Sequence, residues 1–431
     1  MKLLNHWLRW LIGIFMIFSG TVKAIDPIGT SIKNKEYFEV FTEYFGFLTP
    51  LWDVLASQSL VLAIFLIILE IVLGVMLLLG VYKRFTMGTM FAMIVFFTFL
   101  TGFTVFTGKV TDCGCFGDFL KLKPIETFSK DIVLTVLLIV MWLLRKFWTP
   151  FVRKELLSFL IMGVITAVVV ALLTSYGMTG KMVIVVLMIA SAFFYGSVHL
   201  GAGGFALRNI VLLIMTIATT AFTMRNVMNL PIVDFRAYKV GTDLRDCTST
   251  EGLDPGETIM KFPMSKGGEK LVIKSEEYGK YYKEGWKMDG DRIDEVIREP
   301  EEPKCKDFVV KDNDEGEWQE DLLAHKGYSL WVSSYDIDLG SVAGFDKIAK
   351  MLGSVQDESV KKVGMTGTSI EKGEKLVNSR CTFYNLDATP IKTMNRSNPG
   401  LTVVKDGKVV AKYHHGHLPD EAELKSKFGI D

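Results

Sequence analysis

The chain has 431 residues, 49% of them hydrophobic, and its 48 basic and 48 acidic residues cancel to a formal net charge of +0. This length and apolar content exceed what one soluble domain needs. The neutral balance gives no electrostatic case for nucleic acid as a partner. Five cysteines are too few for a fold held together by disulfides.

The apolar residues are concentrated in the first 230 positions, where the sequence predicts seven membrane-spanning helices, or five at fewest. A helix of about 20 residues crosses a bilayer. The first span is interpreted as a retained helix, because further spans follow it and no small-residue cleavage site does. Residues 1–149 are predicted to form a four-helix membrane domain, and residues 150–228 three more helices. The predicted spans are 4–24, 60–81, 85–106, 131–148, 156–176, 182–200 and 205–227.

Basic residues predict the orientation of these spans. The segments "YKRF" at 82–85 and "RKFWTPFVRK" at 145–154 join neighbouring spans, and Lys2 and Arg9 lie near the start. Loops rich in lysine and arginine stay in the cytoplasm. We therefore predict a protein of the bacterial inner membrane, with its N-terminus in the cytoplasm and its C-terminal half in the periplasm. The loop "TDCGCFGDF" at 111–119 is then periplasmic, where disulfides persist.

Cys113 and Cys115 in that loop are the main candidate catalytic residues. Chain geometry places the Cα atoms of such a pair about 5.5–7 Å apart, and a disulfide needs roughly 4.4–6.8 Å. Gly114 permits the required turn, and a strained bond would be reduced easily. We interpret the pair as a redox-active dithiol. A static loop disulfide, metal binding and inert thiols are the alternatives, and no metal is predicted because no histidine lies nearby in the sequence.

Glu70 is the third candidate catalytic residue, in the middle of the second span within "FLIILEIVLGVM". A carboxylate at membrane depth is costly and usually has a partner. Lys23, at the outer end of the first span, is one candidate partner, and Arg9, at the cytoplasmic end, is the other. Glu70 is predicted to act as a proton relay or to hydrogen-bond to a quinone. A polar contact between helices is an equal alternative.

The connector between the first two spans predicts an amphipathic helix on the outer membrane interface, where it could cover the cysteine loop. Its aromatic residues at helical spacing are Tyr37, Phe38, Phe41, Tyr44, Phe45 and Phe47.

The outer half is predicted to have two parts. Residues 229–302 are interpreted as an irregular or small α+β connector. Residues 303–431 alternate strands and helices and predict an α/β layer. Its strands are predicted at 328–336, 361–367 and 381–387, its helices at 343–353 and 370–378, and a hairpin around Asp406–Gly407 precedes a closing helix capped by Asp420.

The remaining cysteines and the histidine-rich segment have structural interpretations. Cys247 and Cys305 are candidates for a structural disulfide between the connector and the last domain. Cys381 begins a predicted core strand and is interpreted as a buried apolar residue. The segment "YHHGH" at 413–417 is interpreted as an exposed loop rather than a metal site.

The order of elements in residues 303–431 resembles the thioredoxin fold. The segment "CKDFVVKDNDEGEWQEDLLAHKGYSLWVSSYD" is similar to the opening of its periplasmic redoxin branch. The resemblance implies a cis-proline before the terminal hairpin, and Pro399 matches it, so Asn398–Pro399 is the candidate cis bond. Where those redox proteins carry Cys-x-x-Cys, this chain reads "DIDLGSVAGF". The domain is therefore expected to bind a partner rather than to exchange disulfides itself.

The first 148 residues resemble the MauE family within the wider DoxX-like group. The resemblance rests on "FSGTVKAIDPIGT", "ILEIVLGVMLLLGVYKR" and "DCGCFGD". The combination with an outer thioredoxin-like domain is similar to a Bacteroidetes family. MauE is linked to maturation of a disulfide-rich periplasmic enzyme subunit, and DoxX relatives to quinone-coupled sulfur oxidation. The resemblance thus implies a membrane thiol–disulfide oxidoreductase with a quinone as electron carrier and a periplasmic client. The alternative is a non-enzymatic scaffold whose outer domain binds cell-envelope partners.

Overall fold

The computed structural model describes residues 1–110, 116–120, 122–149, 204–298 and 300–430. Contacts divide the chain into two compact units, Met1–Arg236 and Ala237–Asp431. The spans predicted at 156–176 and 182–200, and both Cys113 and Cys115, lie outside the described residues.

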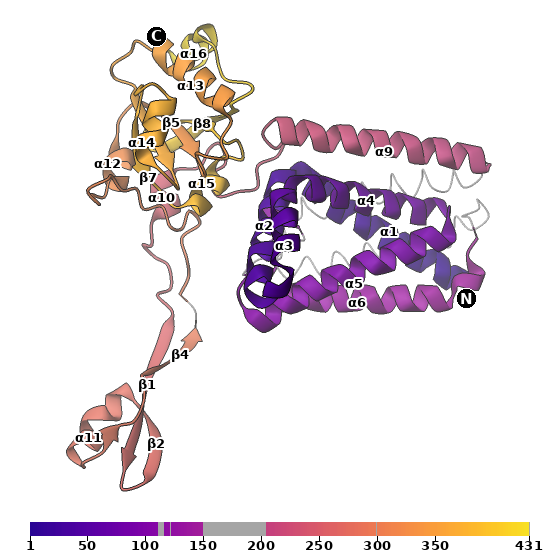
Figure 1. Cartoon of the computed structure of the whole chain (residues 1–431), viewed down its shortest axis with the longest axis horizontal. Coiled ribbons are helices and arrows are strands. Elements are labelled where there is room, and N and C mark those ends of the chain that lie inside the picture. The colour runs from indigo at the N-terminus through magenta and orange to yellow at the C-terminus, as the bar shows by residue number, and fades with distance from the viewer. Residues whose placement is uncertain (111–115, 121, 150–203, 299, 431) are drawn as a thin grey trace. The chain divides into compact units, whose positions relative to one another are not determined.

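The first unit is helical, with α4 packed against α1, α2 and α9, and α5 packed against α6 (Figure 1). Four of its described helices, α1, α4, α5 and α9, are long and apolar enough to cross a membrane. The span predicted at 131–148 corresponds to α6, which begins and ends earlier and has Glu126, Lys130 and Asp131 in its first half. The helices are α1 (Lys2–Ile25), α2 (Pro27–Tyr44), α3 (Thr49–Ser57), α4 (Ser59–Leu79), α5 (Lys83–Thr107), α6 (Pro124–Leu143) and α9 (Phe205–Met228), with short 3₁₀ turns η1 (Gly46–Leu48), η2 (Gly117–Phe119) and η3 (Arg145–Phe147).

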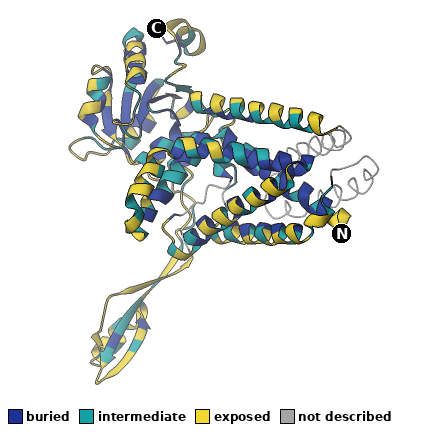
Figure 2. Cartoon of the chain, turned by 45° about the vertical axis from the view of Figure 1, so that its right-hand side comes forward, coloured by how far each residue is buried: buried dark blue, intermediate teal, exposed yellow. Residues whose placement is uncertain are grey.

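Residue exposure is consistent with the membrane assignment of this unit. Large apolar side chains along α9 face outward, as the yellow faces in Figure 2 show. An apolar surface of this kind is stable in lipid but not in water. Helix α4 ends at Gly80, whose φ of +69° is the left-handed conformation that commonly ends helices. The exposed residues on α9 are Phe205, Leu207, Ile210, Leu213, Ile214, Ile217, Met224 and Met228.

The segment between the first two spans forms helix α2, and its aromatic residues pack on protein rather than on the membrane interface that the sequence predicted. Its aromatic residues Tyr37, Phe38 and Phe41 are buried in a cluster with Leu100 of α5. Tyr37 also hydrogen-bonds Thr104 of α5 at 2.7 Å. The aromatic pattern therefore marks a contact with a neighbouring helix. The sequence could not show this, because a neighbouring helix and lipid headgroups favour the same amphipathic spacing.

The second unit contains a five-stranded sheet in the order β7-β6-β5-β8-β9. Strands β5, β6 and β7 are parallel, and β8 and β9 form an antiparallel hairpin that joins β5. Both faces of the central strand β5 are buried, as is usual for a central strand of a largely parallel sheet. The strands are β5 (Tyr328–Ser334), β6 (Lys361–Thr366), β7 (Thr382–Asn385), β8 (Gly400–Lys405) and β9 (Lys408–His414).

Helices pack with this sheet, and α13 to α16 have side-chain caps where they begin. Ser341, Ser369 and Asp387 accept backbone hydrogen bonds at the starts of α13, α14 and α15, and Asp420 does so at α16. Helix α15 was not predicted from the sequence. The helices are α12 (Gln319–Ala324), α13 (Val342–Ser354), α14 (Ile370–Leu376), α15 (Ala388–Met394) and α16 (Glu421–Phe428).

The connector predicted at 229–302 is divided in the structure. Helix α10 (Leu244–Thr248) packs into the core of the second unit through Leu244 and Cys247. The rest forms a small antiparallel sheet whose surface is mostly exposed (Figure 2). Its elements are β1 (Glu257–Lys266), β2 (Glu269–Lys274), η5 (Ser275–Glu277), α11 (Tyr278–Lys283), β3 (Lys287–Met288) and β4 (Ile293–Arg298).

Candidate functional site

A buried ion pair joins α1 and α4 inside the helical unit. The Lys23 ammonium donates to Glu70 Oε2 at 2.7 Å, and the two side chains are 8% and 2% exposed. The Lys23 nitrogen also lies 4.6 Å from the centroid of the Phe97 ring of α5. Phe97 thus adds a cation–π contact to the ammonium. Of the two partners that the sequence offered for Glu70, Lys23 and Arg9, the structure shows Lys23.

Glycines hold α1 and α4 in direct backbone contact beside this pair. A Cβ atom on Gly74 would lie 2.7 Å from the Gly13 carbonyl oxygen, and one on Gly20 would lie 2.5 Å from an Ile71 side-chain carbon. Small residues allow helices in membranes to approach closely. The spacing of α1 and α4 is therefore set by backbone packing, and Lys23 and Glu70 meet within it.

Arg9, the other candidate partner of Glu70, has a different role at the opposite end of α1. Its guanidinium donates to the Leu77 carbonyl at 3.1 and 2.9 Å and lies over the Trp148 ring at 4.2 Å. Leu77 lies in the last turn of α4, whose carbonyls carry partial negative charge. Arg9 thus stabilises the C-terminal end of α4.

A second buried carboxylate lies between α5 and α6. Asp131 accepts hydrogen bonds from Thr101 Oγ1 at 3.1 Å and from Lys130 Nζ at 2.5 Å, and its side chain is 3% exposed. The Lys130 ammonium lies 5.6 Å from the Phe15 ring centroid and 5.4 Å from that of Phe116. Sequence reasoning missed this group, although an acid at the start of an apolar run was the available signal.

Phe116 fixes the described end of the cysteine loop to α1. It directly follows Cys115 in the chain. Its ring packs edge-on against Phe15 and lies 5.9 Å from Phe18, and Phe18 also contacts Phe119 at 5.8 Å. Phe15, Phe18 and Lys23 belong to the same helix, so one element carries both the loop contact and the ion pair.

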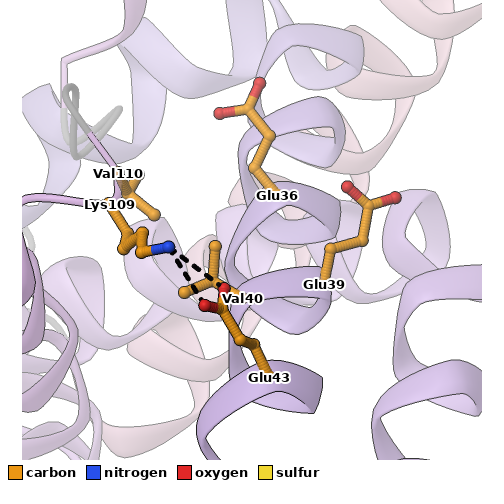
Figure 3. Close-up of a pocket in the computed structure, with 6 residues that line it drawn as sticks. All are labelled: Glu36, Glu39, Val40, Glu43, Lys109 and Val110. Atoms are coloured by element: carbon orange, nitrogen blue, oxygen red, sulfur yellow. Dashed lines mark hydrogen bonds and ion pairs between the residues drawn. The ribbon is translucent and has the colours of Figure 1, made fainter.

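A pocket of about 360 Å³ is lined by three glutamates and Val40 of α2 and by Lys109 and Val110, which follow α5 (Figure 3). In Figure 3 the Lys109 side chain reaches Glu43, at 3.0 Å, whereas Glu36 and Glu39 point elsewhere. Glu36 and Glu39 pair with Lys33 and Lys35 of their own helix. Every carboxylate in the pocket has a lysine partner, so we interpret it as a charge-balanced surface.

In the second unit, the loop after β5 is where thioredoxin-like proteins carry a redox dithiol. In this chain the loop is held by hydrogen bonds to the cis-proline loop. The Asn398–Pro399 peptide bond is cis. Asn398 accepts from Ser334 Oγ at 2.6 Å and donates to the Asp336 carbonyl at 2.8 Å. Its own carbonyl accepts from the backbone of Ser341. These bonds join the cis-proline loop to the loop after β5, which has no thiol.

The cysteines of this unit are structural. Cys247 and Cys305 form a disulfide that closes the segment containing the small sheet. Cys381 is a buried free thiol, and burial raises its pKa to about 12. A thiol with so high a pKa forms almost no thiolate at neutral pH, so Cys381 is a poor nucleophile.

The histidine segment differs in part from the exposed loop that the sequence predicted, because His414 ends β9 and both His414 and His415 are half-buried. His415 Nδ1 lies 2.8 Å from the buried Ser397 hydroxyl, and the ring packs on His414. Burial lowers the pKa of His414 to about 4, so it is neutral at physiological pH. No three His, Cys, Asp or Glu side chains among the described residues could hold a metal together.

Comparison with known proteins finds a family match for part of the helical unit. Residues 1–145 match the family model described as Methylamine utilisation protein MauE. No curated protein matches the chain, and no solved structure does. The match covers α1 to α6, which contain the Lys23–Glu70 and Lys130–Asp131 ion pairs. The N-terminal third of the chain is therefore a MauE-like membrane region.

Proposed function

We propose that this chain is a membrane thiol–disulfide redox protein that uses Cys113 and Cys115 and serves a protein client. The observation that carries the proposal is the buried Lys23–Glu70 pair in a MauE-like bundle. Charged groups at membrane depth are expensive and are usually retained for function. The loop at 111–119 holds Cys113 and Cys115, which are separated by one residue. Phe116, which follows Cys115, packs on Phe15 of α1, the helix that carries Lys23.

The proposed reaction is a two-electron exchange at the cysteine pair. Oxidation of the two thiols to one disulfide removes two electrons and two protons. The disulfide returns to two thiols when it oxidises two thiols of the client to a disulfide, and the reverse exchange reduces a client disulfide while it oxidises the pair. A carrier must take up or supply those electrons, and a membrane quinone is the chemical class proposed.

The ion pair at Glu70 does not fit a quinone site. The Lys23 ammonium and the Glu70 carboxylate satisfy each other at 2.7 Å, and the Phe97 ring occupies another side of the ammonium. A quinone carbonyl would have to displace one of these contacts. We therefore derive no step through a quinone at this position.

The proposed location is a bacterial inner membrane with the N-terminus in the cytoplasm. Two observations support this. Arg9 lies at the end of α1 nearest the basic segment after α6, as the distribution of lysine and arginine predicts. Cys247 and Cys305 form a disulfide, and such bonds persist in the periplasm. The cysteine loop and the second unit are accordingly proposed to be periplasmic.

The second unit is proposed to be a thioredoxin-like domain that binds the client. Its three parallel strands, terminal hairpin and cis-proline support this fold. The absence of a thiol in the loop after β5 and the burial of Cys381 favour binding over catalysis. The same observations favour a second candidate function, a membrane scaffold in which this domain binds envelope partners and the cysteine pair has no redox role.

Single-cysteine variants separate the two functions. Cys113→Ser or Cys115→Ser leaves one thiol that cannot resolve a mixed disulfide with a client. The redox proposal predicts that one of these variants accumulates as a covalent adduct that reducing agents release. The scaffold proposal predicts no adduct in either variant, and partners that co-purify equally with the wild type and the Cys113→Ser, Cys115→Ser double variant.

A further inference from the structure

His415 lies at a junction of three elements in the second unit. It directly follows β9, and its ring packs so closely on α13 that a Cβ atom on Gly344 would lie 2.8 Å from the ring carbon Cγ. Its Nδ1 lies 2.8 Å from the Ser397 hydroxyl and 3.2 Å from the Pro399 carbonyl oxygen. One imidazole therefore joins the end of β9 to α13 and to the cis-proline loop, residues 395–399.

The hydrogen bonds of the cis-proline loop meet at this junction. The Ser397 hydroxyl accepts from the His415 backbone N–H at 3.1 Å and donates to the Pro399 carbonyl at 2.5 Å. The next carbonyl in the chain, that of Asn398, accepts from the N–H of Ser341, the residue that caps α13. Ser397 is only 2% exposed, so water cannot readily replace these bonds. The position of the loop on the start of α13 thus depends on groups that His415 contacts.

A protonated His415 would meet positive charge from its neighbours. Gly344 lies in the first turn of α13, a helix of 13 residues, where free N–H groups carry partial positive charge. Lys347 follows on the same helix, and the His414 ring lies 4.2 Å from that of His415. Together with His417, these are the titratable groups that face the ring in the described part of the chain, and none is an acid. Burial also lowers the pKa of both His414 and His415, so the folded domain favours neutral rings.

We propose that His415 and His414 form an acid-sensitive latch, which holds the cis-proline loop on the start of α13 while the rings are neutral and releases the loop when they bind protons. A ring freed from these neighbours takes up a proton near its ordinary pKa of about 6.5, whereas the packed ring does so only at lower pH. The closed loop is therefore fully stabilised above about pH 6.5 and loses this stabilisation as the pH falls below it. Because the second unit is proposed to bind the client, release would weaken client binding in acid, and this consequence alone rests on the proposed function.

Three variants separate the latch from general packing. His415→Asn keeps a polar atom near the position of Nδ1 but cannot bind a proton, so the loop should lose most of its response to acid. Lys347→Met removes the cation that faces the ring, so release should require a lower pH. Lys350→Met removes another exposed lysine of α13 and is the matched control, which should behave as the wild type.

The test is hydrogen exchange of the full-length protein in detergent micelles, followed by mass spectrometry and corrected for the intrinsic effect of pH on exchange. The reporters are the backbone N–H groups of His415 and Ser341, because their acceptors belong to the cis-proline loop. Between about pH 7.5 and about pH 5.5, one such histidine should raise the opened fraction about tenfold. Strand β6, in the core of the same sheet, should keep its protection over this range.

Three results would overturn the inference. One is wild-type protection at the reporters that does not change with pH, and another is an acid response that His415→Asn retains in full. The third is an equal loss of protection in β6, which would mean that the whole unit unfolds. If His415→Asn fails to accumulate, Lys347→Met decides the matter, because an acid response equal to that of Lys350→Met would also contradict the latch. The assay observes the loop without a client, so its failure is distinguishable from failure of the proposed function.

Discussion

Lys23 and Glu70 form an ion pair at 2.7 Å between two helices that are also in backbone contact through Gly13, Gly20 and Gly74. The glycines set the distance between the helices, and the charged residues occupy the space that results. This arrangement separates the packing of α1 on α4 from the chemistry of the pair, and it leads to two independent predictions.

The first prediction concerns the charges. Lys23→Met leaves the Glu70 carboxylate buried without its partner, and breaking such a pair costs about 3–5 kcal/mol. The double variant Lys23→Met, Glu70→Met should recover most of the lost stability, because it buries no charge. Thermal unfolding of the protein in detergent micelles measures both. Lys33→Met, which breaks the partly exposed pair with Glu36, is the control and should cost about 1 kcal/mol or less. A single variant as stable as the double variant would contradict the prediction.

The second prediction concerns the glycines. Gly74→Ala places a Cβ atom against the Gly13 carbonyl oxygen and an Ile17 side-chain carbon, at 2.7 and 2.8 Å. Because one of these atoms is backbone, the helices must separate, and overpacking of this kind costs about 1–3 kcal/mol. Gly88→Ala in α5 meets nothing within 4 Å and should leave the unfolding temperature unchanged or raise it. Equal behaviour of the two variants would show that the α1–α4 contact is looser than the structure indicates.

The third prediction concerns the disulfide of the second unit. Cys247 and Cys305 are separated by 58 positions, and closing a loop of that length stabilises a fold by about 4 kcal/mol in the chain-entropy model. Cys247→Ser, Cys305→Ser should therefore lower the urea concentration at which this unit becomes sensitive to protease. Reducing agent should have the same effect on the wild-type protein, and no effect on the double variant. Resistance to urea that does not depend on the disulfide would refute the prediction.

The fourth prediction uses the thiol of Cys381. Burial raises its pKa to about 12, well above the usual range for cysteine. The thiolate is the form that reacts, so at pH 8 roughly one molecule in ten thousand has a reactive Cys381. At pH 8 iodoacetamide should modify Cys381 appreciably only after denaturation. At higher pH the rate in the folded protein should keep rising beyond the range in which an exposed thiol is fully ionised. Rapid modification of the native protein at pH 8 would mean that the β7 region opens readily.

The sequence predicted most elements of both units because their patterns are local. Continuous apolar runs identified α1, α4, α5 and α9, and alternation of strands and helices identified β5, β6, α13 and the terminal hairpin. Helix α15 was missed, since seven residues containing a proline give a weak helical signal. The aromatic face of α2 was assigned to the membrane interface because its spacing cannot distinguish lipid headgroups from a neighbouring helix.

The candidate site was predicted only in part, because its charged groups meet through tertiary contacts. Glu70 was evident as an acid in an apolar helix, and the topology of the spans left Lys23 as one of two partners. Asp131 was not singled out, because it follows Lys130 directly and adjacent opposite charges resemble a solvated helix surface. Only the positions of Thr101 and Phe116 reveal that this pair faces inward. Likewise, the predicted disulfide of Cys247 linked residues 237–248 to the second unit, but nothing in this segment alone indicated that Leu244 belongs to its core.

The oxidation state of Cys113 and Cys115 in native membranes tests the central claim most directly. Cells are quenched with acid, free thiols are labelled, and the peptide that contains both cysteines is weighed before and after reduction. The account predicts a mixture of dithiol and disulfide whose ratio changes when respiration is blocked and returns when it resumes. A pair that remains fully reduced and unreactive, or fully oxidised under every condition, would contradict it.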